Sequence, residues 1–170
     1  GEQDAKMKMA LSCTAFKKDS LVLDVGCGTG LLFERVGKSV RLLVGLDISS
    51  RILKEAKRRV KRFPTTAVVR ADADFTPFRS DVFDVTFAMT LLQNVPDPLV
   101  ALREMKRVSK DRAFIAITGL KKEFSREAFV KLLQRVRLNV SVMESSGELK
   151  GYVAMCWKGR KHLKERFGSY

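Results

Sequence analysis

Residues 21–30 read L-V-L-D-V-G-C-G-T-G, an apolar run that ends in three alternating glycines. The run predicts a buried strand, and the residues after it predict a helix over 31–37. Glycine accepts positive φ angles and has no Cβ to hold a ligand away from the backbone. The first N–H groups of a helix are unpaired and can face such a ligand. The stretch therefore predicts the opening of an α/β nucleotide-binding unit, although a tight turn without a ligand remains open.

The composition indicates a folded, single-domain protein. The chain has 170 residues, of which 45% are hydrophobic, so we expect one folded domain over 1–170, with a helical segment in 1–19 and a basic tail in 159–170. No apolar run approaches the roughly 20 residues that span a bilayer, and the first ten residues do not resemble a secretory signal. Cys13, Cys27 and Cys156 form neither a disulfide framework nor a paired metal spacing. We therefore expect a cytoplasmic protein without a metal or a membrane partner.

The charge is strongly positive, with 33 Lys and Arg against 19 Asp and Glu and a net charge of +14. This excess favours a polyanionic partner, with nucleic acid as the first candidate. The chain also has only three Gln, two Asn and one His. Such a charge-rich, amide-poor composition is typical of thermophiles, which gives a competing explanation for the charge.

Strand and helix patterns alternate along the chain. We predict strands over 20–25, 40–47, 66–70, 82–88, 113–118, 139–145 and 151–158. We predict helices over 5–17, 30–38, 50–63 and 98–108, and one after Ser125. Alternation indicates a parallel sheet with helices on both faces, and the short link between the last two strands makes them antiparallel. The expected fold is α/β, a Rossmann-like doubly wound seven-stranded sheet, mostly parallel with one antiparallel strand near the edge.

Four features follow the ends of predicted parallel strands, where open α/β sheets bind ligands. They are the glycine turn with Asp24, then Asp47, then Asp72-Ala73, and the link that follows F-D-V at 83–85. A carboxylate such as Asp47, 17 residues after Gly30, can accept hydrogen bonds from a ribose diol. Singly, Asp47 could instead cap a helix, Asp72 could lie in a solvated loop, and 88–97 could be an ordinary link.

In combination these residues resemble the class I S-adenosylmethionine (SAM) dependent methyltransferases. The resemblance runs from about residue 20 to 116 and rests on D-V-G-C-G-T-G, G-L-D-I-S, A-D-A-D-F-T-P-F and F-D-V. It implies a seventh strand inserted antiparallel beside the fifth, and SAM as the cofactor.

The resemblance also implies roles for single residues. The turn formed by Gly26, Cys27, Gly28 and Gly30 would hold the amino-acid part of SAM, with Asp24 ordering the turn. Asp47 would bind the ribose and Ile48 would pack on the adenine. Asp72, beside Ala73, would accept from the adenine amino group, and Met89 would lie near the reactive methyl.

The methyl acceptor is less constrained. The sequence departs from many relatives at Gln93-Asn94, where they have His-His, and no catalytic base can be named. A sulfonium methyl needs mainly alignment and exclusion of water. We expect Gln93, Asn94, Lys121, Lys122 and Lys150 to face a structured RNA, either tRNA or rRNA.

Three alternatives to the RNA methyltransferase remain open. They are a protein substrate, a small-molecule substrate, and a non-catalytic SAM- or RNA-binding subunit of a methyltransferase complex. A small activator subunit is a further expected partner, since some relatives with so small a core use one.

Overall fold

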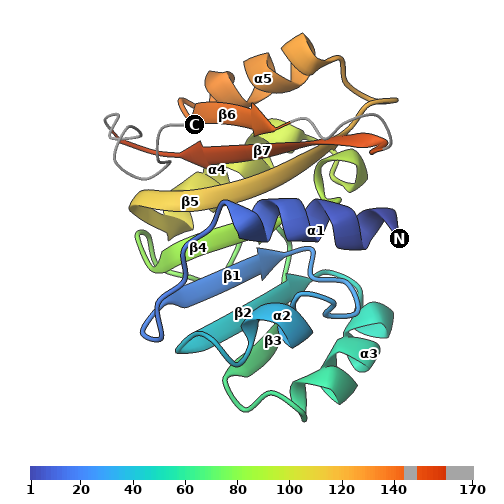
Figure 1. The fold of residues 1–170 in the computed structure, drawn as a ribbon, viewed down its shortest axis with the longest axis vertical. Helices are drawn as coiled ribbons and strands as arrows, with labels where there is room; N and C mark the ends of the chain where they lie inside the picture. Colours follow the sequence, from blue (N-terminus) through green and yellow to red (C-terminus); the bar gives the residue numbers. More distant parts are fainter. Residues whose placement is uncertain (144–148, 160–170) are drawn as a thin grey trace.

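The computed structural model describes residues 1–143 and 149–159, as a seven-stranded sheet with helices on both faces (Figure 1). The helices are α1 (Glu2–Ser12), α2 (Phe33–Val36), α3 (Ser50–Val60), the 3-10 turn η1 (Leu92–Asn94), α4 (Pro98–Val108) and α5 (Arg126–Arg135). The strands are β1 (Leu21–Val25), β2 (Leu42–Asp47), β3 (Thr66–Arg70), β4 (Phe83–Ala88), β5 (Ser109–Leu120), β6 (Asn139–Met143) and β7 (Gly151–Trp157).

The strand order is β3-β2-β1-β4-β5-β7-β6. Strands β1 to β5 pair in parallel, whereas β7 is antiparallel to both β5 and β6. The one reversed strand therefore lies second from the edge, which confirms the predicted fold class and the place of the antiparallel strand.

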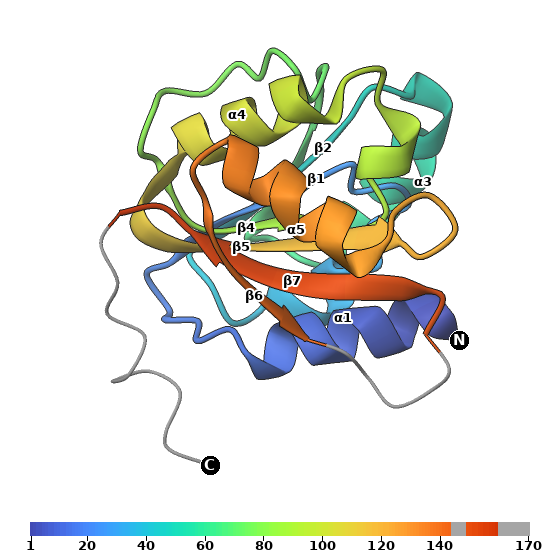
Figure 2. The same ribbon diagram turned by 90° about the horizontal axis from the view of Figure 1, so that it is seen from above.

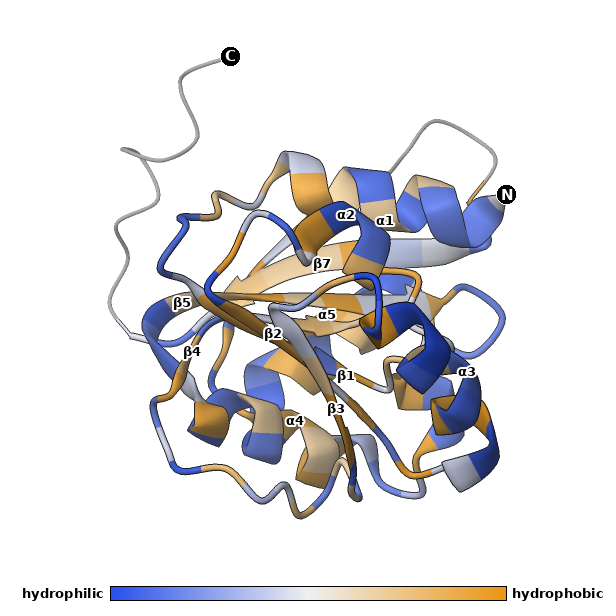
Figure 3. Ribbon diagram, turned by 90° about the horizontal axis from the view of Figure 1, so that it is seen from below, coloured by the Kyte–Doolittle hydropathy of each residue, from blue (hydrophilic) through white to orange (hydrophobic). Residues whose placement is uncertain are grey.

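Alternate residues of each central strand pack on opposite faces, as the pleat requires. In β1, Val22 joins the core under α1, α2 and α3, while Leu23 and Val25 join the core under α4 and α5. Figure 2 shows α4 and α5 on one side of the sheet and α1 on the other. In Figure 3 the strands are largely hydrophobic, whereas α3 is mostly hydrophilic on its outer side. Both faces of the sheet are thus covered, which explains why its strands read as continuous apolar runs.

Several elements differ from their predicted extents. The helix expected over 5–17 is α1, which starts at Glu2 and ends at Ser12. The helix expected over 30–38 is reduced to the four residues of α2, because residues 28–32 remain in turns. Strand β5 starts at Ser109, directly after α4, four residues before its predicted start. It is longer because it pairs with β4 on one side and β7 on the other, with a register shift opposite Phe83. The predicted basic tail and the loop at 144–148 lie outside the described residues.

The carboxyl ends of β1, β2, β3 and β4 meet at one edge of the sheet, where the predicted ligand residues follow them. No helix in the described ranges is both long enough and apolar enough to cross a membrane.

Candidate functional site

A cavity of about 790 Å³ opens at this edge. Its walls come from the ends of four parallel strands and from one side of α1. It is lined by Gln3, Met7, Asp24, Gly26, Cys27, Gly28, Thr29, Leu31, Leu32, Leu46, Asp47, Ile48, Ser49, Ile52, Ala71, Asp72, Ala73, Met89, Thr90, Leu91, Asn94, Val95 and Pro96. Nine of the ten residues predicted to bind the cofactor are in this set, and only Gly30 is not.

The glycine turn after β1 forms the floor of the cavity. Gly26, Gly28 and Gly30 have φ angles of 71°, 56° and 84°, which side chains rarely allow. A Cβ on Gly28 would meet no protein atom, whereas a Cβ on Gly30 would overlap the buried ring of Phe33. Gly28 therefore keeps space open for a ligand, while Gly30 allows Phe33 to pack beneath the turn.

Strand β2 holds this turn in place. The backbone N–H groups of Gly26 and Cys27 donate to the carbonyl oxygen of Leu46, at 2.7 and 2.9 Å. The N–H of Gly28 donates to the Asp47 carboxylate at 3.0 Å. The other oxygen of Asp47 accepts from the N–H of Ser49 at 2.9 Å. The turn's N–H groups are thus largely used within the protein, so the site is not built on free N–H donors.

Among the described residues, no hydrogen bond joins the Asp24 side chain to the glycine turn, which is held by Asp47 instead. The Asp24 side chain is buried against the cavity and accepts no hydrogen bond from any described residue. Burial, and then the negative charge of Asp47, raises the pKa of the Asp24 carboxyl from 3.8 to about 7. A buried acceptor without a partner is unfavourable unless a ligand supplies the donor. Asp24 is therefore a polar group at the cavity wall that is divided between its protonated and ionised forms near pH 7.

The cavity is acidic although the chain is strongly basic. Three carboxylates line it, those of Asp24, Asp47 and Asp72, and no Lys or Arg among the described residues does so. A site for a dinucleotide or another phosphate ligand requires N–H donors or cations. The charge of this cavity instead suits a cationic ligand.

The comparison with protein families shows which class of nucleotide-binding protein this chain belongs to. A model of the methyltransferase domain family matches residues 23–117, which include the glycine turn, Asp47, Asp72 and Met89. The chain belongs to this family. Its members are class I SAM-dependent methyltransferases, and the cofactor of the family is SAM.

Two curated relatives of this methyltransferase-family chain are named as quinone methyltransferases. The demethylmenaquinone methyltransferase of Lysinibacillus sphaericus is 40% identical over 100 residues, 56% of this chain and 42% of the relative. The 2-phytyl-1,4-naphtoquinone methyltransferase of Synechococcus elongatus is 34% identical over 124 residues, 69% of this chain and 53% of the relative. The chain thus spans about half the length of the curated relatives it matches.

A solved structure shares the fold at low sequence identity. The S-adenosylmethionine dependent methyltransferase of Mesorhizobium loti aligns with a TM-score of 0.79 at 14% identity, over 92% of this chain and all of that one.

The lining residues of this methyltransferase-family chain fit SAM. The cofactor carries a sulfonium and an ammonium, and the cavity offers three acidic side chains, of which Asp24 is buried. Ile48 lies at the mouth with 62% of its surface exposed, and Asp72 and Ala73 follow β3 beside it. When bound, SAM supplies an electrophilic methyl group. Asp24 and Asp47 would hold its charged and polar parts, and Ile48 would cover its base.

Most of the residues predicted to face the methyl acceptor do not line the cavity. The side-chain amides of Gln93 and Asn94 donate to the carbonyl oxygen of Thr90, at 2.9 and 2.8 Å, so both hold the link after β4. Asn94 still lines the cavity, whereas Gln93 does not. Lys121, Lys122 and Lys150 do not line it either, although they lie at the same edge of the sheet. Lys121 lies over the Tyr152 ring, 5.7 Å from its centre, and Lys122 pairs with Glu123 at 3.7 Å.

Helix α1 contributes two lining residues that the sequence did not suggest. Gln3 and Met7 form one wall, and Gln3 exchanges hydrogen bonds of 2.9 Å with the Thr90 hydroxyl. Thr90 has a φ of 66°, unusual for a β-branched residue, and its N–H donates to Thr118 at 2.7 Å. Strained residues of this kind concentrate at ligand sites. The only signal in the sequence was a helical pattern before the first strand, which does not say what the helix covers.

Proposed function

We propose that this chain is a SAM-dependent methyltransferase whose acceptor is a small, neutral aromatic molecule of the naphthoquinone type. One observation carries the cofactor part of the proposal. In a chain with a net charge of +14, the cavity of the family's cofactor is lined by three carboxylates and, within the described residues, by no cation. A sulfonium donor complements that charge.

The lining near Met89 supports an apolar acceptor. Met7, Leu91, Val95 and Pro96 share the cavity with Met89. Apolar walls with few polar groups are typical of sites for small organic ligands. The names of the two quinone methyltransferases among the relatives point to the same class of acceptor.

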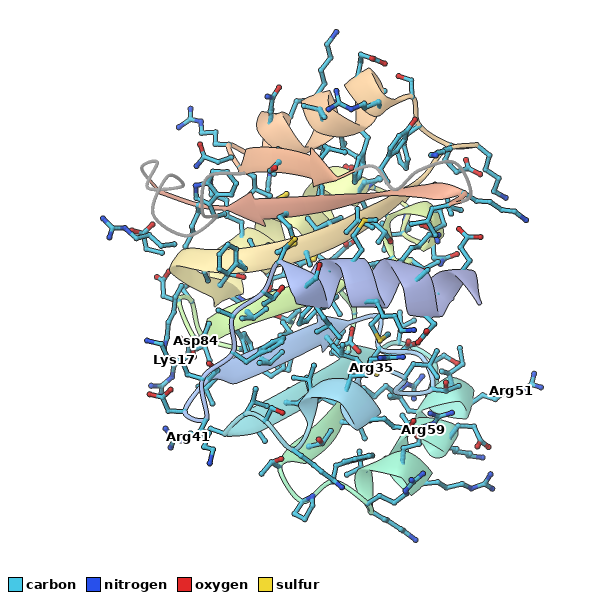
Figure 4. All side chains as sticks on the ribbon, viewed as in Figure 1. Lys17, Arg35, Arg41, Arg51, Arg59 and Asp84 are labelled. Atoms are coloured by element: carbon cyan, nitrogen blue, oxygen red, sulfur yellow. The ribbon has the colours of Figure 1, made fainter. Side chains whose placement is uncertain are left out.

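The prediction of an RNA acceptor draws less support from the site. The lysines expected to contact phosphates lie outside the cavity lining. The basic residues of α3 lie on its exposed face, and Arg51 points away from the body of the molecule (Figure 4). A solvated helix face explains these charges without a nucleic acid.

The residues would act mainly by orientation. Methyl transfer breaks the bond from sulfur to methyl, forms a bond from methyl to the acceptor, and releases a proton from an acceptor carbon or hydroxyl. The carboxylates of Asp24 and Asp47 would fix the donor, and the apolar wall would exclude water from the acceptor. Such alignment accounts for most of the barrier lowering that transfer from an activated methyl requires.

A radiolabel assay tests the proposal. Chain and methyl-labelled SAM are incubated with reduced 1,4-naphthoquinone, with total RNA or with extracted protein. We expect label in the quinone fraction, lost in Asp47→Ala and retained in Asp19→Ala, which removes an exposed carboxylate far from the cavity. Label in the RNA fraction alone would refute the proposed acceptor. SAM binding without transfer to any acceptor would favour the non-catalytic subunit or the need for a small activator subunit.

A further inference from the structure

A second cavity lies at the opposite edge of the sheet, where α4 and α5 end. It has a volume of about 360 Å³ and is lined by residues from the ends of both helices and by the residue that follows β7. Its lining residues are Arg103, Lys106, Arg107, Arg135, Val136, Arg137 and Lys158. We call it the basic cavity, because six of these seven residues are cationic and none is acidic.

Two of the six cations are neutralised locally. Arg107 makes a two-pronged ion pair with Glu104, at 2.6 and 2.8 Å, and also donates to the carbonyl oxygen of Phe78. Lys158 pairs with Asp81. These two residues are therefore held by the protein itself.

The other four cations have no carboxylate partner within the described part of the chain. They are Arg103, Lys106, Arg135 and Arg137. The carbonyl ends of α4 and α5 offset some of this charge, and Lys106 donates to the carbonyl oxygen of Val136 at 2.9 Å. Each helix end supplies only about half a negative charge, so two ends offset roughly one of four positive charges.

Lys106 lies close enough to Arg137 and Lys158 to be repelled by their positive charges. Burial lowers the pKa of the Lys106 ammonium, and the positive charges of Arg137 and Lys158 lower it further. A multivalent anion placed among these groups would relieve the repulsion and supply acceptors for guanidinium and ammonium donors.

Arg137 occupies a backbone position that normally favours glycine. Its φ is 58°, and its N–H donates to the carbonyl oxygen of Gln134 at 2.8 Å, which closes the end of α5. Glycine would adopt this conformation without strain. The end of the helix therefore does not require an arginine, and what Arg137 adds is a guanidinium at the rim of the cavity.

We propose that the basic cavity binds a compact phosphate anion with several charges, such as a diphosphate or triphosphate group. The cations come from α4, α5 and the residue after β7 and surround one shallow, open depression, where Arg103, Arg135 and Arg137 are exposed. An extended nucleic-acid backbone or a flat bilayer would instead favour a stripe or a plane of charge. The inference does not depend on the proposed methyl acceptor, since the two cavities lie at opposite edges of the sheet.

Calorimetric titration with inorganic tripolyphosphate at fixed ionic strength tests the proposal. In the double variant Arg103→Gln/Arg137→Gly we expect binding weaker by about tenfold or more, the effect of losing charge-assisted hydrogen bonds. The melting temperature should not fall, because glycine suits position 137. The matched control Lys54→Gln/Lys57→Gln removes the same charge from the exposed face of α3 and should bind as the parent chain does.

Three outcomes would overturn the inference. They are tripolyphosphate binding that is equal in the parent and in the double variant, equal weakening by the α3 control, and no tripolyphosphate binding at all. Binding of single-stranded RNA or phosphatidylglycerol vesicles that requires the two arginines, with tripolyphosphate inert, would show that the ligand is another polyanion. SAM affinity should be unchanged in the double variant.

Discussion

The carboxylate of Asp47 accepts a hydrogen bond from the backbone N–H of Gly28 across the gap between β2 and β1, at 3.0 Å. The glycine turn and the acidic residue that ends the next strand therefore form one unit. Asp47 also accepts from the N–H of Ser49, so it fixes the start of α3 as well. A carboxylate has about four acceptor positions, which leaves capacity for a ligand hydroxyl.

Replacing Asp47 by alanine should weaken SAM binding by about tenfold or more, because the proposed ribose acceptor is lost. The free energy of unfolding should also fall by about 2 kcal/mol, because two backbone N–H groups lose a charged acceptor. Calorimetry with SAM and denaturant titration measure the two effects. Asp19→Ala serves as the control, and equal SAM affinity in Asp47→Ala and the parent would refute the proposed role.

Asp24 should make stability depend on pH. Its pKa is 3.8 in the unfolded chain and about 7 in the folded one, so folding takes up a proton between these values. The contribution of Asp24 to the free energy of unfolding is therefore fully present below about pH 3.8. It falls as the pH rises towards about 7, by at most about 1.4 kcal/mol per pH unit. Denaturant titrations between about pH 5 and about pH 8 measure the slope.

The variant Asp24→Asn isolates this effect. An amide does not titrate, so the slope between about pH 5 and about pH 7 should be flatter than in the parent chain. Glu104 titrates in a separate range, since the Arg107 guanidinium lowers the pKa of its carboxyl to about 2. An unchanged slope in Asp24→Asn would mean that Asp24 is ionised in the folded chain at neutral pH.

Two glycines of the same turn should respond differently to alanine. Gly28→Ala places a methyl group in open space at the cavity, so it should weaken SAM binding while unfolding becomes easier by only about 1 kcal/mol from backbone strain. Gly30→Ala forces a methyl group into the ring of Phe33 and should lower the free energy of unfolding by about 2–4 kcal/mol. Parallel measurements of melting and SAM affinity separate the two roles. A larger loss of stability in Gly28→Ala than in Gly30→Ala would contradict them.

Cys27 should be chemically inert despite its place between two glycines. Burial raises the pKa of its thiol, and the negative charges of Asp24 and Asp47 raise it further. The thiolate is the reactive form, so iodoacetamide should modify the half-buried Cys13 well before Cys27. Mass spectrometry of a time course identifies the order. Rapid labelling of Cys27 would show that its thiol is reactive.

The sequence predicted those parts of the site that follow strands. Apolar runs and the residues at their ends located Asp24, Asp47, Asp72 and Met89, because parallel strands end at a common edge. It could not predict the wall formed by α1, since the bond between Gln3 and Thr90 joins residues 87 positions apart. Nor could it show that Asp47, rather than Asp24, holds the turn. Asp24 lies one residue before the end of β1 and Asp47 ends β2, and the pairing of β1 with β2 brings the Asp47 carboxylate to the N–H of Gly28.

The acidic lining has a consequence for turnover. Methyl transfer converts the sulfonium of SAM into an uncharged thioether, so the spent cofactor carries one positive charge fewer than the donor. In the proposed cofactor site, Asp47, Asp72 and the ionised form of Asp24 would therefore attract the donor more strongly than its by-product. The same carboxylates would attract a fresh cofactor and would lose part of that attraction once it has reacted, which would favour its exchange for the next one.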